Sequence, residues 1–474
     1  MEKLRPKSRK ITISRSMSAS TQSKERNNSS GSGENIVKRS VTSKSREDST
    51  SSCTIPTGSP VWLSYRPILI FGRIVGGFRL TRDNVSPLMR RLLAVYSVAV
   101  ALYVFAVFVR FMTYFDYSGG FQFGTKFLLN LLCCGFMLSA NSSHLFFARI
   151  QGQFPAYLRS MEAAIGETAE ENSKGTPPRY SDRFPVLRKT VIICTVYSVI
   201  VTLMAAGSLA LFNLDLFHSQ FSLRLIPGPP WVIVAEFLGG FFAQGLVAFA
   251  LSFYALLCVT MGAALHELST EISLAGDRGA LLGEVGAFHA RFKALQGVCG
   301  ELNLLFSRFV FLRYASALPI ICLCFFHVLG GGLSTTDHQV VLLTWTFMFL
   351  FSMVMVTVPA IYLGEQGAAF RLAVSEGYVH LMKRKMDNGA VKQDFHGVNA
   401  NNLARLQLLS QHAGRAAIGI NAGGFFLVNR SVVLTVVSAV ITYLVVILQY
   451  SSSNRMAEQA TSTAFLSSAN CTAQ

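Results

Sequence analysis

The sequence predicts an all-α integral membrane protein with seven transmembrane helices, a cytoplasmic N-terminus, an extracellular C-terminus and a pore-lining last helix. The observations behind this are the composition, the spacing of apolar runs and the placement of Lys and Arg. Of 474 residues, 51% are hydrophobic and only 14% are charged, and the mean hydropathy is +0.42. Soluble domains carry about 25% charged residues, so this composition favours a membrane protein.

Seven apolar runs are long enough to cross a hydrocarbon core of about 30 Å as helices. The fourth run exceeds one simple crossing, so we expect its end to continue into the cytosol as helix. A barrel is not expected, because its strands would alternate apolar and polar residues. No signal peptide is predicted, because the first apolar stretch follows a long polar segment. The runs lie at approximately 92–114, 127–149, 190–213, 232–265, 305–330, 339–363 and 424–450.

The distribution of Lys and Arg predicts the orientation, since cytoplasmic segments carry the excess. Residues 1–91 hold 18 of them, and the loops 149–189, 266–304 and 364–423 hold 7, 3 and 7. The segments on the other side hold only Lys126, Arg224 and Arg455. The N-terminus is therefore expected in the cytoplasm, and seven crossings place the C-terminus outside.

The segments between and around the runs complete the predicted domain organisation. Apolar residues recur at helical spacing in 266–304, and 402–420 is also expected to be helix. The predicted parts are a disordered cytoplasmic tail (1–55), a juxtamembrane amphipathic segment (56–91), transmembrane helices 1–6 with a ligand pocket in their outer half (92–363), a cytoplasmic anchor segment (364–423), pore helix 7 (424–450) and an extracellular tail (451–474) with a glycosylation sequon at Asn470.

The motifs of catalysis and of cofactor or metal binding are missing from the sequence. There is no CxxC pair, HExxH, GxxxxGK[ST] or GxSxG, so we predict no catalytic residues, no metal site and no cofactor, and the protein is not expected to be an enzyme. The net charge of +17 lies in tails and loops, so no nucleic-acid partner is expected.

A polar stripe runs along the last apolar segment. At about 100° per residue, five polar side chains fall within an arc of about 60°, flanked by Val445 and Val446. We interpret the stripe as the lining of a water-filled pore formed by several copies of the chain. The alternative is that the hydroxyls bond back to the helix carbonyls or hold helices together. The stripe consists of Ser431, Thr435, Ser438, Thr442 and Gln449.

The same segment resembles the signature of insect gustatory receptors, which is Thr-Tyr, five apolar residues and Gln-Phe. Here it reads Thr442-Tyr443, Leu444 to Leu448 and Gln449-Tyr450, with Tyr450 in place of Phe. The run from Gly423 to Val433 is also similar to the family's approach to its last helix. The resemblance implies a homotetrameric, ligand-gated, non-selective cation channel in which Tyr450 lies at the pore mouth, with related subunits as further candidates for assembly.

Polar groups in the outer half of the bundle predict the ligand pocket, because such groups are costly in a membrane. An indole, an amide and a carboxylate suit a sugar or another small polyol, and a bitter compound remains open. The alternatives are that Trp345 is an interfacial anchor and that Glu236 pairs with Arg110. The candidate ligand-binding residues are Trp345, Glu236, Gln244, Thr344, Tyr114 and Asp215.

Together these features predict a gustatory-receptor-like channel opened by a small tastant, in the plasma membrane as a multi-pass protein whose partners are the tastant and the lipid bilayer. One alternative is a seven-helix receptor that signals through a G protein, which requires an extracellular N-terminus. The other is a transporter, for which paired repeats and broken helices would be expected.

Overall fold

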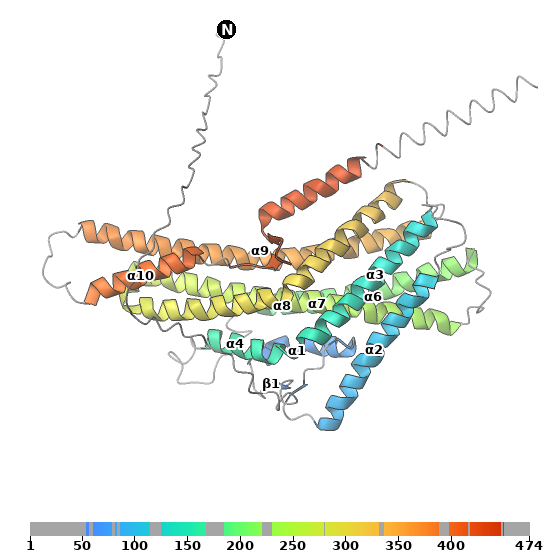
Figure 1. Cartoon of the computed structure of the whole chain (residues 1–474), viewed down its shortest axis with the longest axis horizontal. Coiled ribbons are helices and arrows are strands. Elements are labelled where there is room, and N and C mark those ends of the chain that lie inside the picture. The colour runs from blue at the N-terminus through green and yellow to red at the C-terminus, as the bar shows by residue number, and fades with distance from the viewer. Residues whose placement is uncertain are drawn as a thin grey trace, which may run out of the picture. The chain divides into compact units, whose positions relative to one another are not determined.

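A computed structural model of the chain describes residues 54–55, 60–77, 81–82, 86–113, 125–166, 184–219, 230–278, 280–330, 336–387, 398–415, 418–446 and 449. These residues form helices with two short strand pairs (Figure 1). The helices are α1 (Pro60–Ile74), α2 (Pro87–Thr113), α3 (Thr125–Ile150), α4 (Phe154–Gly166), α6 (Pro185–Ser219), α7 (Pro230–Arg278), α8 (Leu281–Gly330), α9 (Thr336–Asp387) and α10 (Val398–Arg415). A last apolar helix follows at Arg430–Val446.

Each of the seven predicted apolar runs overlaps one of these helices. Among the described residues, five stretches are long and apolar enough to cross a membrane. They are Pro87–Arg110, Pro185–Ser208, Phe237–Arg278, Leu281–Phe325 and Leu342–Lys383. Helix α3 covers the second run, and the last helix covers part of the seventh. The predicted all-α membrane class is confirmed at this level.

Helix α7 forms the centre of the bundle, and its most apolar stretch is buried throughout. It packs against α6 and α9. Small residues permit the close approach of neighbouring helices. A Cβ on Gly262 would lie 2.5 Å from the ring of Tyr362, and one on Gly245 would lie 2.5 Å from Val75. A hydrogen bond of 2.8 Å between the hydroxyls of Ser198 and Ser252 joins α6 to α7 inside this core.

Three helices are much longer than a membrane is thick. Helices α7, α8 and α9 have 49, 50 and 52 residues. At 1.5 Å per residue each is about 75 Å long, against a hydrocarbon core of about 30 Å. The expected continuation of the fourth run as helix is confirmed, since α7 ends only at Arg278. In the extended part, Phe292 of α8 stacks on Phe370 of α9 with 4.3 Å between ring centroids.

The approach to the last helix differs from the prediction. Helix α10 ends at Arg415, and β3 (Asn421–Ala422) and β4 (Phe426–Leu427) then form an antiparallel hairpin. The prediction of helix at 416–420 and 424–429 was therefore wrong for the described residues there. The reason is a turn in which Gly423 and Gly424 have φ of 63° and 88°, a conformation that glycine adopts without strain.

The hairpin is fixed to α8 by hydrogen bonds and ring contacts. The amide of Gly423 donates to the carbonyl and the hydroxyl of Ser307, both at 3.0 Å. Phe425 stacks on Phe311, and Phe426 meets Tyr314 edge-on. The chain entering the last helix is therefore held by the middle of α8. The other strand pair, β1 (Thr54–Ile55) with β2 (Thr81–Arg82), is parallel.

Candidate functional site

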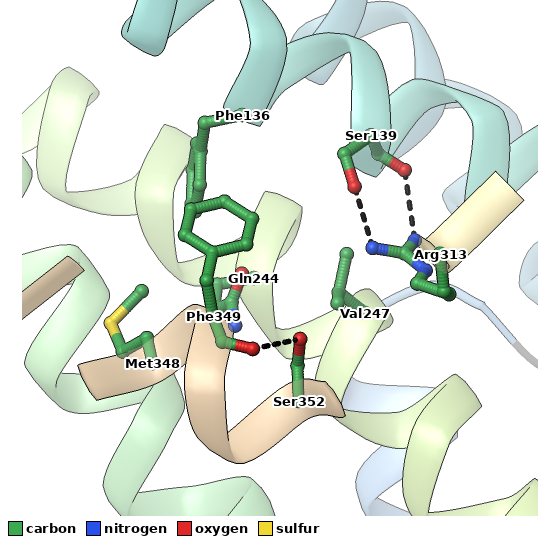
Figure 2. A pocket seen from close by; sticks show the side chains of 8 residues that line it. All are labelled: Phe136, Ser139, Gln244, Val247, Arg313, Met348, Phe349 and Ser352. Atoms are coloured by element: carbon green, nitrogen blue, oxygen red, sulfur yellow. Dashed lines mark hydrogen bonds between the residues drawn. The ribbon is translucent and has the colours of Figure 1, made fainter. Parts of the chain in front are cut away.

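A small cavity lies among α3, α7, α8 and α9 (Figure 2). The space open to the centre of a water molecule is about 10 Å³, which is about the room that one water needs. Four lining side chains are apolar and four are polar. The lining residues are Phe136, Ser139, Gln244, Val247, Arg313, Met348, Phe349 and Ser352.

Arg313 provides the charge of this cavity. The side chain is 4% exposed. Its Nη1 donates to the hydroxyl of Ser139 at 2.5 Å, and its Nη2 donates to the carbonyl of the same residue at 3.0 Å. Nη2 also donates to the hydroxyl of Ser143. The guanidinium carbon lies 5.1 Å from the ring centroid of Phe309. All these partners are neutral, so the positive charge is buried among dipoles.

The sequence did not identify Arg313 as a site residue. Because Arg313 lies near the start of the predicted run at 305–330, its long basic side chain could be taken to reach the membrane surface, but the structure buries it. Helix α8 begins at Leu281 and continues to Gly330, so Arg313 lies inside the helix. The available signal was the absence of proline between residues 281 and 313, which allows one helix to continue through Arg313 and makes it an internal charge.

Gln244, one of the candidate ligand-binding residues, lines the same cavity from α7. The side chain is 5% exposed. The residues that the structure describes provide no hydrogen bond to its amide. A buried amide has two donors and two acceptor lone pairs, so Gln244 offers unused hydrogen-bonding capacity to the cavity.

Trp345 lies beside the cavity, but its polar group is already used. The indole is 2% exposed and stacks on Phe136, with 6.0 Å between ring centroids and an interplanar angle of 7°. Its Nε1 donates to the hydroxyl of Ser208 at 2.9 Å. Trp345 is therefore a core residue that supports Phe136, which forms part of the cavity wall. The interfacial-anchor alternative does not apply to so buried a side chain.

The other predicted pocket residues are not brought to this cavity. Thr344 is half-buried, and its hydroxyl donates to the carbonyl of Val340 on its own helix. Glu236 and Asp215 lie on α7 and α6, but their side chains, like Tyr114 as a whole, fall outside the described residues.

The last helix presents the predicted stripe at its surface. The side chains of Ser438, Thr442 and Gln449 are exposed, and Val445 and Val446 are 48% and 55% exposed. Tyr450 and Asn470 lie outside the described residues. Apolar residues on other faces are exposed as well, including Leu434 and Ile441. Figure 1 shows the helix (red) diverging from the long helices after the hairpin.

The hydroxyls of this helix adopt the back-bonded arrangement that was the alternative to a pore lining. Thr435 donates to the carbonyl of Ser431 at 3.0 Å, and Thr442 donates to that of Ser438 at 2.9 Å. A donating hydroxyl keeps two lone pairs, which remain on the exposed surface. Each threonine hydroxyl therefore donates its proton within the helix, and the lone pairs of its oxygen can still accept hydrogen bonds at the exposed surface.

The start of the last helix is fixed at two points. The amide of Val432 donates to the side-chain oxygen of Asn429 at 2.9 Å, which caps the helix N-terminus. Arg430 forms an ion pair with Glu365 of α9. The last helix is thereby connected to α8 through the hairpin and to α9 through this pair.

The family described as 7tm Chemosensory receptor matches residues 65–454. A solved structure of the insect olfactory receptor OR5 from Machilis hrabei is 15% identical, with a TM-score of 0.60 over 82% of this chain and 98% of that chain. The same receptor in complex with eugenol is 16% identical, with a TM-score of 0.58 over 81% and 97%. Among curated proteins, none matches. The structural likeness establishes the fold, an all-helical one.

Proposed function

Because the chain belongs to the 7tm chemosensory receptor family, we propose that it is a gustatory-receptor-like, ligand-gated, non-selective cation channel of the plasma membrane, opened by a small tastant. The observation that carries the proposal is the last helix. Its polar stripe and its apolar faces are both exposed in a single chain, so a second surface must cover part of it.

The proposed topology has seven crossings, a cytoplasmic N-terminus and an extracellular C-terminus. The charge distribution supports this orientation, and it opposes the G-protein-coupled alternative. The proposed topology has a cytoplasmic anchor, which consists of the extended parts of α7, α8 and α9 together with α10. The contacts of α10 with α8 and α9 support this anchor.

One helix cannot enclose water, so the proposed channel is a homotetramer around a central axis. The stripe faces that axis, and the apolar faces meet lipid or neighbouring helices. Val445 and Val446 form an apolar constriction, and Gln449 with Tyr450 provides polar groups at the outer mouth. An apolar ring closes a pore by excluding water. The exposure of Ser438, Thr442 and Gln449 supports this arrangement.

The proposed tastant binds in the bundle of the first six helices, near Gln244. A sugar is the first class to test, because Gln244 offers unused hydrogen-bonding groups, while Phe136 and Phe349 offer aromatic surface. The cavity has room for about one water molecule, so a sugar requires it to widen on binding. Trp345 acts there by supporting Phe136. Thr344, Glu236, Tyr114 and Asp215 remain the proposed outer part of the site.

Cysteine scanning tests the pore face. Cysteines at 438 and 442 are expected to react with a charged thiol reagent in the open channel, and a cysteine at Leu444, on the opposite face, is expected to react at least about tenfold more slowly if a helix at 100° per residue turns it away from water. The readout is the loss of current during reagent application. The wild-type chain controls for its own nine cysteines. Equal rates at 442 and 444 would disprove the stripe.

Whole-cell recording tests the channel itself. A panel of sugars, polyols and bitter compounds is applied while G-protein signalling is blocked and surface protein is measured. We expect a ligand-evoked cation current whose ion permeability ratios change with Gln449→Ala, because this variant removes the four Gln449 side-chain amides that surround the proposed pore mouth. Tyr443→Phe, on another face of the helix, is the matched control and should leave the ratios unchanged. A response that requires active G proteins would contradict the proposal.

A further inference from the structure

Two buried polar side chains from different helices converge on the cavity with hydrogen-bond donors to spare. Arg313 is on α8 and Gln244 is on α7, and both lie among the lining residues in Figure 2. Each is at least nine-tenths buried. A pair of this kind in the interior of a membrane protein indicates a site for something that accepts hydrogen bonds.

The hydrogen bonds of Arg313 leave its charge without a partner of opposite sign. A guanidinium carries five N–H donors, and three are used, all toward Ser139 and Ser143. Among the described residues, no carboxylate pairs with it. Because a buried charge is costly unless it is compensated, the site favours an anion over a neutral molecule of the same size.

The amide of Gln244 can add a neutral donor on the α7 side. It is without a hydrogen bond from the described residues, and its NH₂ group has two donors. The hydroxyl of Ser352, by contrast, donates to the carbonyl of Phe349 at 2.9 Å. The donors available to an occupant are therefore those of Arg313 and Gln244.

The size and walls of the cavity restrict the occupant. The space is about that of one water molecule, and Phe136, Val247, Met348 and Phe349 provide the rest of the lining. Divalent anions would lose too much hydration in such walls. We propose that the Arg313–Gln244 cavity binds one small monovalent anionic group, from either a free halide ion or the carboxylate of a small acid. This site is independent of whether the protein conducts ions.

Thermal unfolding of the purified full-length chain in detergent provides the test. The protein is kept in the sodium salt of HEPES, a bulky sulfonate, at constant ionic strength, and this anion is replaced stepwise by chloride, bromide or formate. We expect a saturable rise in Tm of at least about 2 °C, because an anion that binds only the folded state stabilises it. Chloride, bromide and formate all acting would identify a free-anion site, whereas formate alone would identify a carboxylate site. A wild-type Tm that does not change with any of the three anions would overturn the proposal.

Variants separate the site from general salt effects. Arg313→Gln removes the charge and is expected to abolish the anion-dependent rise in Tm, whereas Arg308→Gln, an exposed arginine on the same helix, should retain it. Gln244→Leu should raise the half-saturating anion concentration about tenfold, the effect of losing one hydrogen bond to a charged group. This variant decides the question if Arg313→Gln does not fold. The proposal would be overturned if Gln244→Leu keeps the wild-type anion response and Arg313→Gln either keeps it as well or does not fold.

Discussion

Replacing Gly423 with valine is expected to abolish ligand-evoked current and to reduce folded protein at the cell surface. Gly423 has φ of 63°, and a Cβ there would lie 2.9 Å from the Cβ of Phe311. A β-branched residue in this conformation is strained, by about 1–3 kcal/mol, and the clash with α8 adds to that. The clash would also displace the backbone amide of residue 423 from Ser307, to which it donates. Surface biotinylation and whole-cell current measure the two effects.

Two neighbouring glycines serve as controls for this substitution. Gly424 has φ of 88°, but nothing lies within 4 Å of an added Cβ. Gly424→Ala should therefore show the backbone strain alone, about 1–2 kcal/mol. Gly414 lies in α10 with open space around it, and Gly414→Ala should be neutral or slightly stabilising. Wild-type current from Gly423→Val would contradict the role assigned to the hairpin.

Replacing Trp345 with alanine is expected to destabilise the folded chain by about 3–5 kcal/mol, the usual cost of removing a buried aromatic side chain. The substitution removes the stacking on Phe136 and leaves the hydroxyl of Ser208 without its indole donor. We expect the detergent-solubilised protein to lose its monodisperse peak in size-exclusion chromatography at temperatures where the wild type keeps it.

Graded substitutions separate the indole from its hydrogen bond. Trp345→Phe keeps an aromatic ring and should cost about 1 kcal/mol or somewhat more, through the lost hydrogen bond and volume. Phe347, on the same helix, is 54% exposed, so Phe347→Ala should have little effect. If Trp345→Ala proved no worse than Phe347→Ala, Trp345 would be no core residue.

The helices could be predicted because long apolar runs in the sequence indicate them. The hairpin was missed because it is part of such a run. Phe425, Phe426 and Leu427 are as apolar as the helix that follows, so hydropathy places no boundary before Arg430. The adjacent glycines at 423 and 424 were the visible turn signal. The contacts that hold the turn lie more than a hundred residues earlier in the chain, at Ser307.

Part of the cavity and its surroundings could be selected from the sequence. Gln244 and Trp345 were selected because polar groups stand out in apolar helices, and the structure places both at or beside one cavity. Arg313 was missed because the residues that surround it in the fold are far from it in the sequence. Its serine partners lie 174 and 170 residues away in sequence, and no spacing rule connects them.

The back-bonded threonines of the last helix have a consequence for biogenesis. An unsatisfied polar group in hydrocarbon costs several kcal/mol, yet Thr435 and Thr442 satisfy their protons on their own carbonyls. In the proposed topology, this helix can therefore leave the translocation machinery for the lipid before the subunit meets another copy. For the proposed homotetramer, single subunits should then persist as inserted intermediates, and oligomerisation should increase with protein density in the membrane.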